Sequence, residues 1–122
     1  MSRQRRKTGQ DGEAIAAAHL TDQGIEILCR NYRNRFGEID IIGNDQGTYI
    51  FVEVKTRKSN RYGSPQEAVT LKKQSQISNI AQSYLQQHNL TDIPVRFDVI
   101  AITFDQDKPL VNHIVAAFDS QR

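Results

Sequence analysis

The sequence has few residues of the kinds that cross-link or anchor a chain. Cys29 is the only cysteine among 122 residues, so no internal disulfide can form. No cluster of cysteine and histidine has the spacing of a structural zinc site. No apolar run is long enough to span a bilayer, and the apolar segment behind the basic N-terminus is short for a signal peptide. These absences predict a soluble, cytoplasmic protein without a membrane partner.

Two classes of enzyme also lack their characteristic residues here. No serine or cysteine has a recognisable base partner, and no glycine-rich phosphate-binding loop is present. His19, His88 and His113 are too far apart in the sequence for a metal-ligand spacing. Hydrolases that form covalent intermediates and nucleotide-dependent enzymes are therefore poor candidates.

The composition is that of one globular domain. Hydrophobic residues make up 38% and charged residues 25% of the chain, which excludes wholesale disorder. The net charge of +2 is too small to identify a polyanionic partner, but the cations are clustered in residues 3–7 and 55–61. We expect residues 1–8 to be a flexible basic arm and residues 9–122 to form a single domain.

Hydrophobic periodicity and turn residues predict two helices and five strands. Ser64, Pro65 and Glu67 have the pattern of a capping box and start the clearest helix. Residues 44–47 have the composition of a hairpin turn. The expected helices are residues 10–23 and 64–88, and the expected strands are 25–30 (at a sheet edge), 37–43, 48–56, 95–104 and 111–118. This order predicts an α/β domain with a mixed sheet.

The predicted hairpin of residues 37–56 carries charges among apolar residues. Asp40 lies in the first strand, and Glu53 and Lys55 lie in the second. If Gly43 pairs with Thr48, strand alternation places Asp40 diagonally across from Glu53 on one face, with Lys55 next along that face. Burying an unpaired ion costs several kcal/mol, so these charges need a partner, a solvated position or a metal.

Two converging carboxylates are hard oxygen ligands of the kind that Mg²⁺ prefers. A cation bound there can activate water and stabilise charge on a phosphodiester, and a neighbouring lysine can orient the water. The spacing therefore fits metal-assisted phosphodiester hydrolysis. It fits a solvated strand face with a cross-strand ion pair equally well, and the spacing alone leaves both open.

The wider sequence resembles a known family. Asp40 followed by Glu53-Val54-Lys55 resembles the PD-(D/E)xK nuclease signature. The segments GEIDII, FVEVKTR, RYGSPQEAV and RFDVIAI are similar to those of the YraN-like family of endonuclease-like proteins. The resemblance extends from Gly9 to Phe118. It implies a restriction-endonuclease-like three-layer fold, with a central mixed sheet flanked by helices, as in archaeal Holliday junction resolvases.

The resemblance also implies roles for five residues. Asp40, Glu53 and the main-chain carbonyl of Val54 would bind Mg²⁺ or Mn²⁺, and Lys55 would be catalytic. Glu13 matches the helix glutamate of the resolvase-like pattern and would bind the metal directly or through water. We therefore assign Glu13, Asp40, Glu53 and Lys55 to the catalytic site.

A basic cluster follows the predicted site in the sequence. Cations there are suited to gripping phosphates, and a tyrosine can stack on a base or sugar. The cluster predicts contact with DNA or RNA, and the family resemblance favours DNA. For any single member a solvated surface position is as good an explanation. The candidates are Arg57, Lys58, Arg61, Tyr62, Lys72 and Lys73.

The sequence thus predicts a metal-dependent endonuclease that hydrolyses phosphodiester bonds of DNA, with branched DNA as a candidate substrate. The alternative is a nucleic-acid-binding or adaptor protein that keeps the fold without turnover. A third option, a protein-interaction module with an incidental acidic patch, predicts no DNA affinity. A homodimer is compatible with the analogy to the resolvases.

Three other acidic residues have simpler explanations. Glu38 lies near the start of its strand and is expected to form an ion pair at the rim. Asp98 lies in an apolar strand, and we expect it to have a structural role. Glu67 is accounted for by helix capping.

Overall fold

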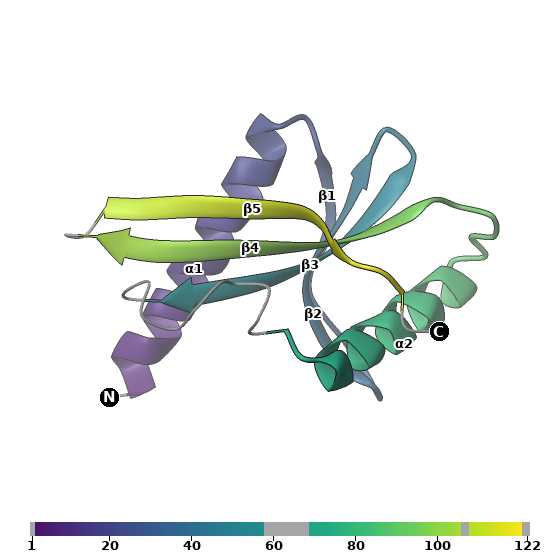
Figure 1. Ribbon diagram of the computed structural model, residues 1–122, viewed down its shortest axis with the longest axis horizontal. Coiled ribbons are helices and arrows are strands. Elements are labelled where there is room, and N and C mark those ends of the chain that lie inside the picture. Colours follow the sequence, from purple (N-terminus) through teal and green to yellow (C-terminus); the bar gives the residue numbers. More distant parts are fainter. Residues whose placement is uncertain (1, 58–68, 106–107, 121–122) are drawn as a thin grey trace.

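The structure is a computed structural model that describes residues 2–57, 69–105 and 108–120. Within these ranges no helix is long and apolar enough to cross a membrane. Figure 1 shows the arrangement of the two helices and five strands found there. In chain order they are α1 (Ser2–Asp22), β1 (Glu26–Asn34), β2 (Gly37–Asp45), β3 (Thr48–Arg57), α2 (Leu71–Gln87), β4 (Val95–Asp105) and β5 (Lys108–Phe118).

The five strands form one sheet in the order β1-β2-β3-β4-β5. β3 and β4 are parallel, whereas the other neighbouring strands are antiparallel. A parallel pair needs a long crossover connection, and α2 lies between β3 and β4 in the chain. β1 is an edge strand, as predicted, but extends to Asn34 instead of ending near residue 30. The predicted α/β class with a mixed sheet is confirmed.

A helix covers each face of the sheet. Figure 1 shows α1 passing behind the strands, with α2 on the other side. Along β3, Ile50 and Val52 pack in the core on the α1 side, whereas Phe51 packs in the core on the α2 side. The central strands are buried on both faces, and for this reason β3 reads as a nearly continuous apolar run. The three-layer arrangement is consistent with a restriction-endonuclease-like fold.

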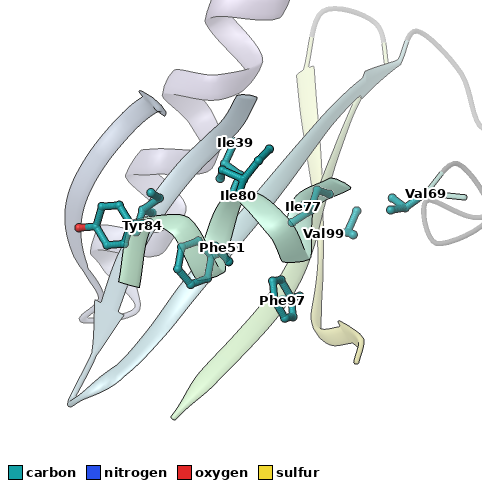
Figure 2. Packing of buried hydrophobic residues seen from close by; sticks show 10 residues of the cluster. Ile39, Phe51, Val69, Ile77, Ile80, Tyr84, Phe97 and Val99 are labelled. Atoms are coloured by element: carbon teal, nitrogen blue, oxygen red, sulfur yellow. The ribbon is translucent and has the colours of Figure 1, made fainter. Parts of the chain in front are cut away.

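The core on the α2 side is built around Tyr84. Its ring meets Phe51 and Tyr32 edge-on, with centroids 5.9 and 5.3 Å apart. Ile77 and Ile80, one turn or more towards the helix start, are buried in the same cluster (Figure 2). Burial of each such side chain stabilises the fold by about 1.5–3 kcal/mol. This packing holds the first turn of α2 near the end of β3.

α1 begins earlier than predicted. Its backbone is helical from Ser2, so the segment 1–8, expected to be a flexible arm, lies in the helix from its second residue. Arginine, lysine and glutamine are good helix formers, and they fill the segment that we expected to be irregular. Gly9 and Gly12 do not end the helix; Gly24, with a φ of 85°, follows it, as predicted.

α2 begins later than predicted. Thr70 is its N-cap, and the Thr70 side chain accepts a hydrogen bond from the Lys73 N–H. Val69 is not helical and is buried in the core, so a continuous helix from residue 64 is wrong. The predicted capping box, Ser64 to Glu67, lies outside the described residues.

The β2–β3 hairpin has a tighter turn than predicted. Asp45 pairs with Thr48 across Gln46 and Gly47, both of which have positive φ. Gly43 therefore pairs with Ile50 and not with Thr48. The strand register differs from the predicted one by two residues, because the loop consists of Gln46 and Gly47 alone, whereas Asn44 and Asp45, which we placed in the loop, belong to β2.

Candidate active site at the end of the β2–β3 hairpin

β2 departs from regular pairing at Asp40. The paired residues of the β2–β3 ladder end at Ile41 and Val52. Ile39 and Ile41 would share a face in a regular strand, but they pack in the cores on opposite sides of the sheet. Beyond the ladder, the Val54 N–H donates to Asp40 Oδ2 at 2.8 Å. A side-chain carboxylate thus takes a backbone donor of β3, which fixes Asp40 beside the strand that carries Glu53.

Glu53 lies next to two lysines from different elements. The residue is buried, with 8% of its surface exposed, although it is ionisable. Lys55 Nζ lies 3.6 Å and Lys73 Nζ lies 4.0 Å from the same oxygen, Glu53 Oε1. Lys55 belongs to β3, whereas Lys73 belongs to the first turn of α2. The burial of α2 against the sheet therefore completes the surroundings of Glu53.

The two carboxyl groups of the hairpin are only partly neutralised. Burial, followed by the charge of Asp40, raises the pKa of Glu53 from 4.5 to about 7, against the opposing effect of Lys73 and Lys55. Burial also raises the pKa of Asp40, although the Val54 N–H acts in the opposite direction. Neighbouring carboxyl groups with raised pKa values are typical of functional sites. A bound cation would favour the ionised form of both.

Glu13 approaches from α1. Burial and then the charge of Asp40 raise the pKa of Glu13, while Arg30 lowers it. Glu13 Oε1 is buried and has no hydrogen-bond partner. The preceding residue explains the close approach of this helix, because a Cβ on Gly12 would overlap the Thr56 side chain of β3. A buried oxygen without a partner is costly, and a cation or its water would satisfy it.

These residues fit a hydrated cation better than an all-protein metal cage. In the part of the chain that the structure describes, no three His, Cys, Asp or Glu side chains lie close enough together to hold a metal. Mg²⁺ needs only one or two protein carboxylates and keeps several waters. Asp40 and Glu53 meet that requirement, and the orphaned Glu13 oxygen suits a contact through water. The donors are all oxygen, as Mg²⁺ and Mn²⁺ prefer.

The predicted nucleic-acid contacts are only partly described. Lys58, Arg61 and Tyr62 lie outside the described residues. Arg57 ends β3 and is half-buried, and Lys72 is exposed on the first turn of α2. Lys73, assigned to phosphate contact from the sequence, is the one that approaches Glu53. The only feature of the sequence that indicated this contact is that Lys73 lies near the start of the helix that follows β3.

A second polar cluster lies on the α1 side of β4 and β5. Asp98 is completely buried and accepts hydrogen bonds from Arg96 Nε at 2.9 Å, from the Ala116 N–H at 3.0 Å, and from His113 Nε2 at 2.7 Å. Burial would raise the pKa of Asp98, but the hydrogen bonds from His113 and Arg96 outweigh it and the pKa is lowered. His113 Nδ1 lies 3.2 Å from His19 Nε2 of α1. Asp98 thus has the structural surroundings expected of it, whereas sequence reasoning missed the pairing of the two histidines.

Fold and site together define an α/β protein with a carboxylate–lysine site at the open end of a hairpin. The chain belongs to the family described as uncharacterised protein family UPF0102, whose model matches residues 12–102. It is 47% identical over 119 residues to a UPF0102 protein of Geobacter metallireducens, covering 98% of each chain. A UPF0102 protein of Trichlorobacter lovleyi is 50% identical over 113 residues, covering 91% of this chain and 89% of the relative. A third, of Syntrophus aciditrophicus, is 48% identical over 113 residues, with 93% and 89% covered.

Proposed function

We propose that this protein is a Mg²⁺- or Mn²⁺-dependent endonuclease that hydrolyses phosphodiester bonds of DNA, with branched DNA as its candidate substrate. The observation that carries the proposal is the incompletely neutralised pair of Asp40 and Glu53, which lies beside Lys55 at the end of the hairpin ladder. The resemblance to PD-(D/E)xK nucleases, which rests on the same three residues, supports it.

Asp40 and Glu53 would hold the cation, together with the carbonyl of Val54 and with Glu13 through water. The bound cation would supply an activated water and would stabilise negative charge on the phosphodiester. Because the pKa of Glu53 is about 7, Glu53 is protonated in part of the molecules near neutral pH. A cation that binds there must displace this proton. Metal binding is therefore expected to strengthen as the pH rises through 7.

Lys55 is the residue best placed to act on the reacting atoms. Its ammonium lies 3.6 Å from Glu53 Oε1, and its side chain is 29% exposed, so it can reach a water or phosphate at the site. It would orient the attacking water and neutralise charge that develops on the phosphate. Lys73 lies beside it, and the first turn of α2 adds the positive end of the helix dipole. This surrounding charge favours a phosphate as the substrate group.

The proposal is tested by incubating the purified protein with linear, flapped and four-way DNA, with and without Mn²⁺. We expect cleavage only with the metal, and none with Asp40→Asn, which removes the charge that a hard cation needs. Asp92→Asn is a matched control, because Asp92 is exposed and its φ of 57° suits asparagine. Binding without cleavage by the parent protein would instead favour a nucleic-acid-binding or adaptor role, and equal cleavage by Asp40→Asn would disprove the assignment.

A further inference from the structure

The β1–β2 hairpin carries three arginines to which the proposed chemistry gives no role. Arg30 and Arg33 lie on β1, and Arg35 lies in the turn between Asn34 and Gly37. All three are exposed. Their side chains interact with acidic groups and with one aromatic ring: Arg30 lowers the pKa of Glu13, Arg33 pairs with Glu38, and the Arg35 guanidinium lies 4.8 Å above the Phe36 ring.

These arginines border the candidate active site. β1 is the neighbour of β2 on the side away from β3, so the arginines lie one strand from Asp40, opposite Glu53 and its lysines. Arg30 is close enough to influence Glu13 electrostatically, and Glu38, the partner of Arg33, influences both Glu13 and Asp40. The site therefore lies between lysines on one side and arginines on the other.

The hairpin that carries the arginines is fastened to α2. Gln76 Nε2 donates to the carbonyl of Phe36 at 2.7 Å, and the Tyr32 hydroxyl donates to Gln87 at 2.9 Å. Asn34 Oδ1 accepts from the Phe36 N–H at 2.8 Å and closes the turn. Gly37 has a φ of 138°, and a Cβ there would overlap the Gln76 side-chain amide, which would have to leave the Phe36 carbonyl. The arginines thus project from a held support, which lowers the entropy lost when they bind a ligand.

The pairing of Arg33 with Glu38 is of the kind that a phosphate can replace. Nε and Nη2 of Arg33 both donate to one oxygen of Glu38, and the Arg33 side chain remains 77% exposed. An exposed ion pair contributes little to stability, so its loss costs little. The two non-bridging oxygens of a phosphodiester can each accept one hydrogen bond from the guanidinium, the bidentate geometry that Arg33 does not reach with the single oxygen of Glu38.

We propose that the arginines of the β1–β2 hairpin bind phosphates of the same nucleic-acid strand that enters the active site. This proposal depends on the function proposed above, because that function determines where the bound strand lies relative to the scissile bond. Arg33 lies three positions after Arg30, with Asn31 at a φ of 55° between them, so the two Cα atoms are at most about 10 Å apart. This spacing allows the two long side chains to meet different phosphates. Glu38 occupies Arg33 in the free protein and competes with the strand for it.

The test is nucleic-acid affinity as a function of salt, measured by fluorescence anisotropy of a labelled four-way DNA without divalent metal. Each of Arg30→Ala, Arg33→Ala and Arg35→Ala is expected to weaken binding several-fold and to flatten the salt slope by up to about one unit. Lys108→Ala is the control, because Lys108 is an exposed cation at the start of the opposite edge strand. It should bind as the parent does.

Glu38→Gln gives a measurement of opposite sign. In Glu38→Gln, Arg33 no longer has a competing carboxylate partner. Affinity for nucleic acid should therefore rise several-fold in the parent background and much less in the Arg33→Ala background. A gain of equal size in both backgrounds would show general charge repulsion by Glu38 and would overturn its role as a competitor for Arg33.

Two results separate this inference from the proposed function. Parent-like salt slopes in all three arginine variants of an active nuclease would overturn the arginine surface and leave the nuclease standing. If the parent protein never cleaves DNA but the arginine variants bind it more weakly, the arginines bind phosphates as proposed and the catalytic function is wrong. If the parent protein binds no nucleic acid at all, the arginine surface is also wrong.

Discussion

Replacing Glu53 with glutamine should stabilise the fold at high pH. The unfolded chain ionises Glu53 near pH 4.5, whereas the folded chain does so at about 7. Between these values the folded state keeps a proton that the unfolded state has lost, so rising pH favours unfolding. The difference corresponds to about 3 kcal/mol once the pH exceeds 7. Glu53→Gln cannot ionise and should escape this loss.

Urea unfolding of the parent and Glu53→Gln at pH 4.5 and pH 8 measures the effect. We expect the free energies of unfolding to be similar at pH 4.5 and to differ by up to about 3 kcal/mol at pH 8, in favour of Glu53→Gln. Glu26→Gln, a change at an exposed glutamate of β1, serves as the control and should leave the pH dependence unchanged. Added Mn²⁺ should stabilise the parent at pH 8 and stabilise Glu53→Gln much less, because the variant has lost one of the two carboxylates that would hold the ion.

A Glu53→Gln variant that is less stable than the parent at pH 8 would refute this reasoning. Such a loss would mean that Lys55 and Lys73 fully neutralise an ionised Glu53. The three charges would then form a structural ion-pair cluster, and the site would not need a cation.

Three further changes separate the roles of neighbouring residues. Lys55→Ala should bind Mn²⁺ at least as tightly as the parent by calorimetry but lose DNA cleavage; parent-like cleavage would reduce Lys55 to an ion-pair partner. Asp98→Ala should lower the free energy of urea unfolding by about 1–3 kcal/mol, because His113 and the Ala116 N–H lose their buried acceptor while Arg96 keeps Asp45, and an unchanged free energy would contradict that role. Gly12→Ala should displace α1 from Thr56 and reduce cleavage with less effect on DNA affinity, whereas unchanged cleavage would show that Glu13 needs no close approach.

The fold was largely predictable because its signals are local. Strand alternation, turn residues and the helix period located both helices and all five strands of the described ranges. Three of the four neighbouring strand pairs are joined by short connections, and the parallel pair β3–β4 is joined through α2. The errors lie at ends of elements: Thr70 and not Ser64 caps the described part of α2. Several residues from 64 to 70 can cap a helix, and only the burial of Val69 decides between them.

The proximity of Asp40, Glu53 and Lys55 was predictable from the sequence, whereas the geometry of their contacts and the position of Lys73 beside Glu53 were not. The prediction that Asp40 lies near Glu53 assumed that side chains alternate regularly along both strands of the hairpin. In the structure Asp40 reaches β3 through the Val54 N–H, at a point where β2 is irregular. No local pattern marks that irregularity, and none marks the contact of Lys73 with Glu53, which depends on the docking of α2. The pairing of His19 with His113, 94 residues apart, likewise depends on tertiary packing.

Calorimetric titration of Mn²⁺ into the protein at pH 7 tests most directly whether the hairpin carboxylates form a cation site. Repeating the titration in two buffers of different ionisation enthalpy counts the protons released. The parent should bind the ion and release part of a proton, because the pKa of Glu53 is about 7. Asp40→Asn should lose most of this binding. A parent that binds no Mn²⁺, or an Asp40→Asn variant that binds it equally well, would contradict the assignment of Asp40 and Glu53 to a metal-dependent site.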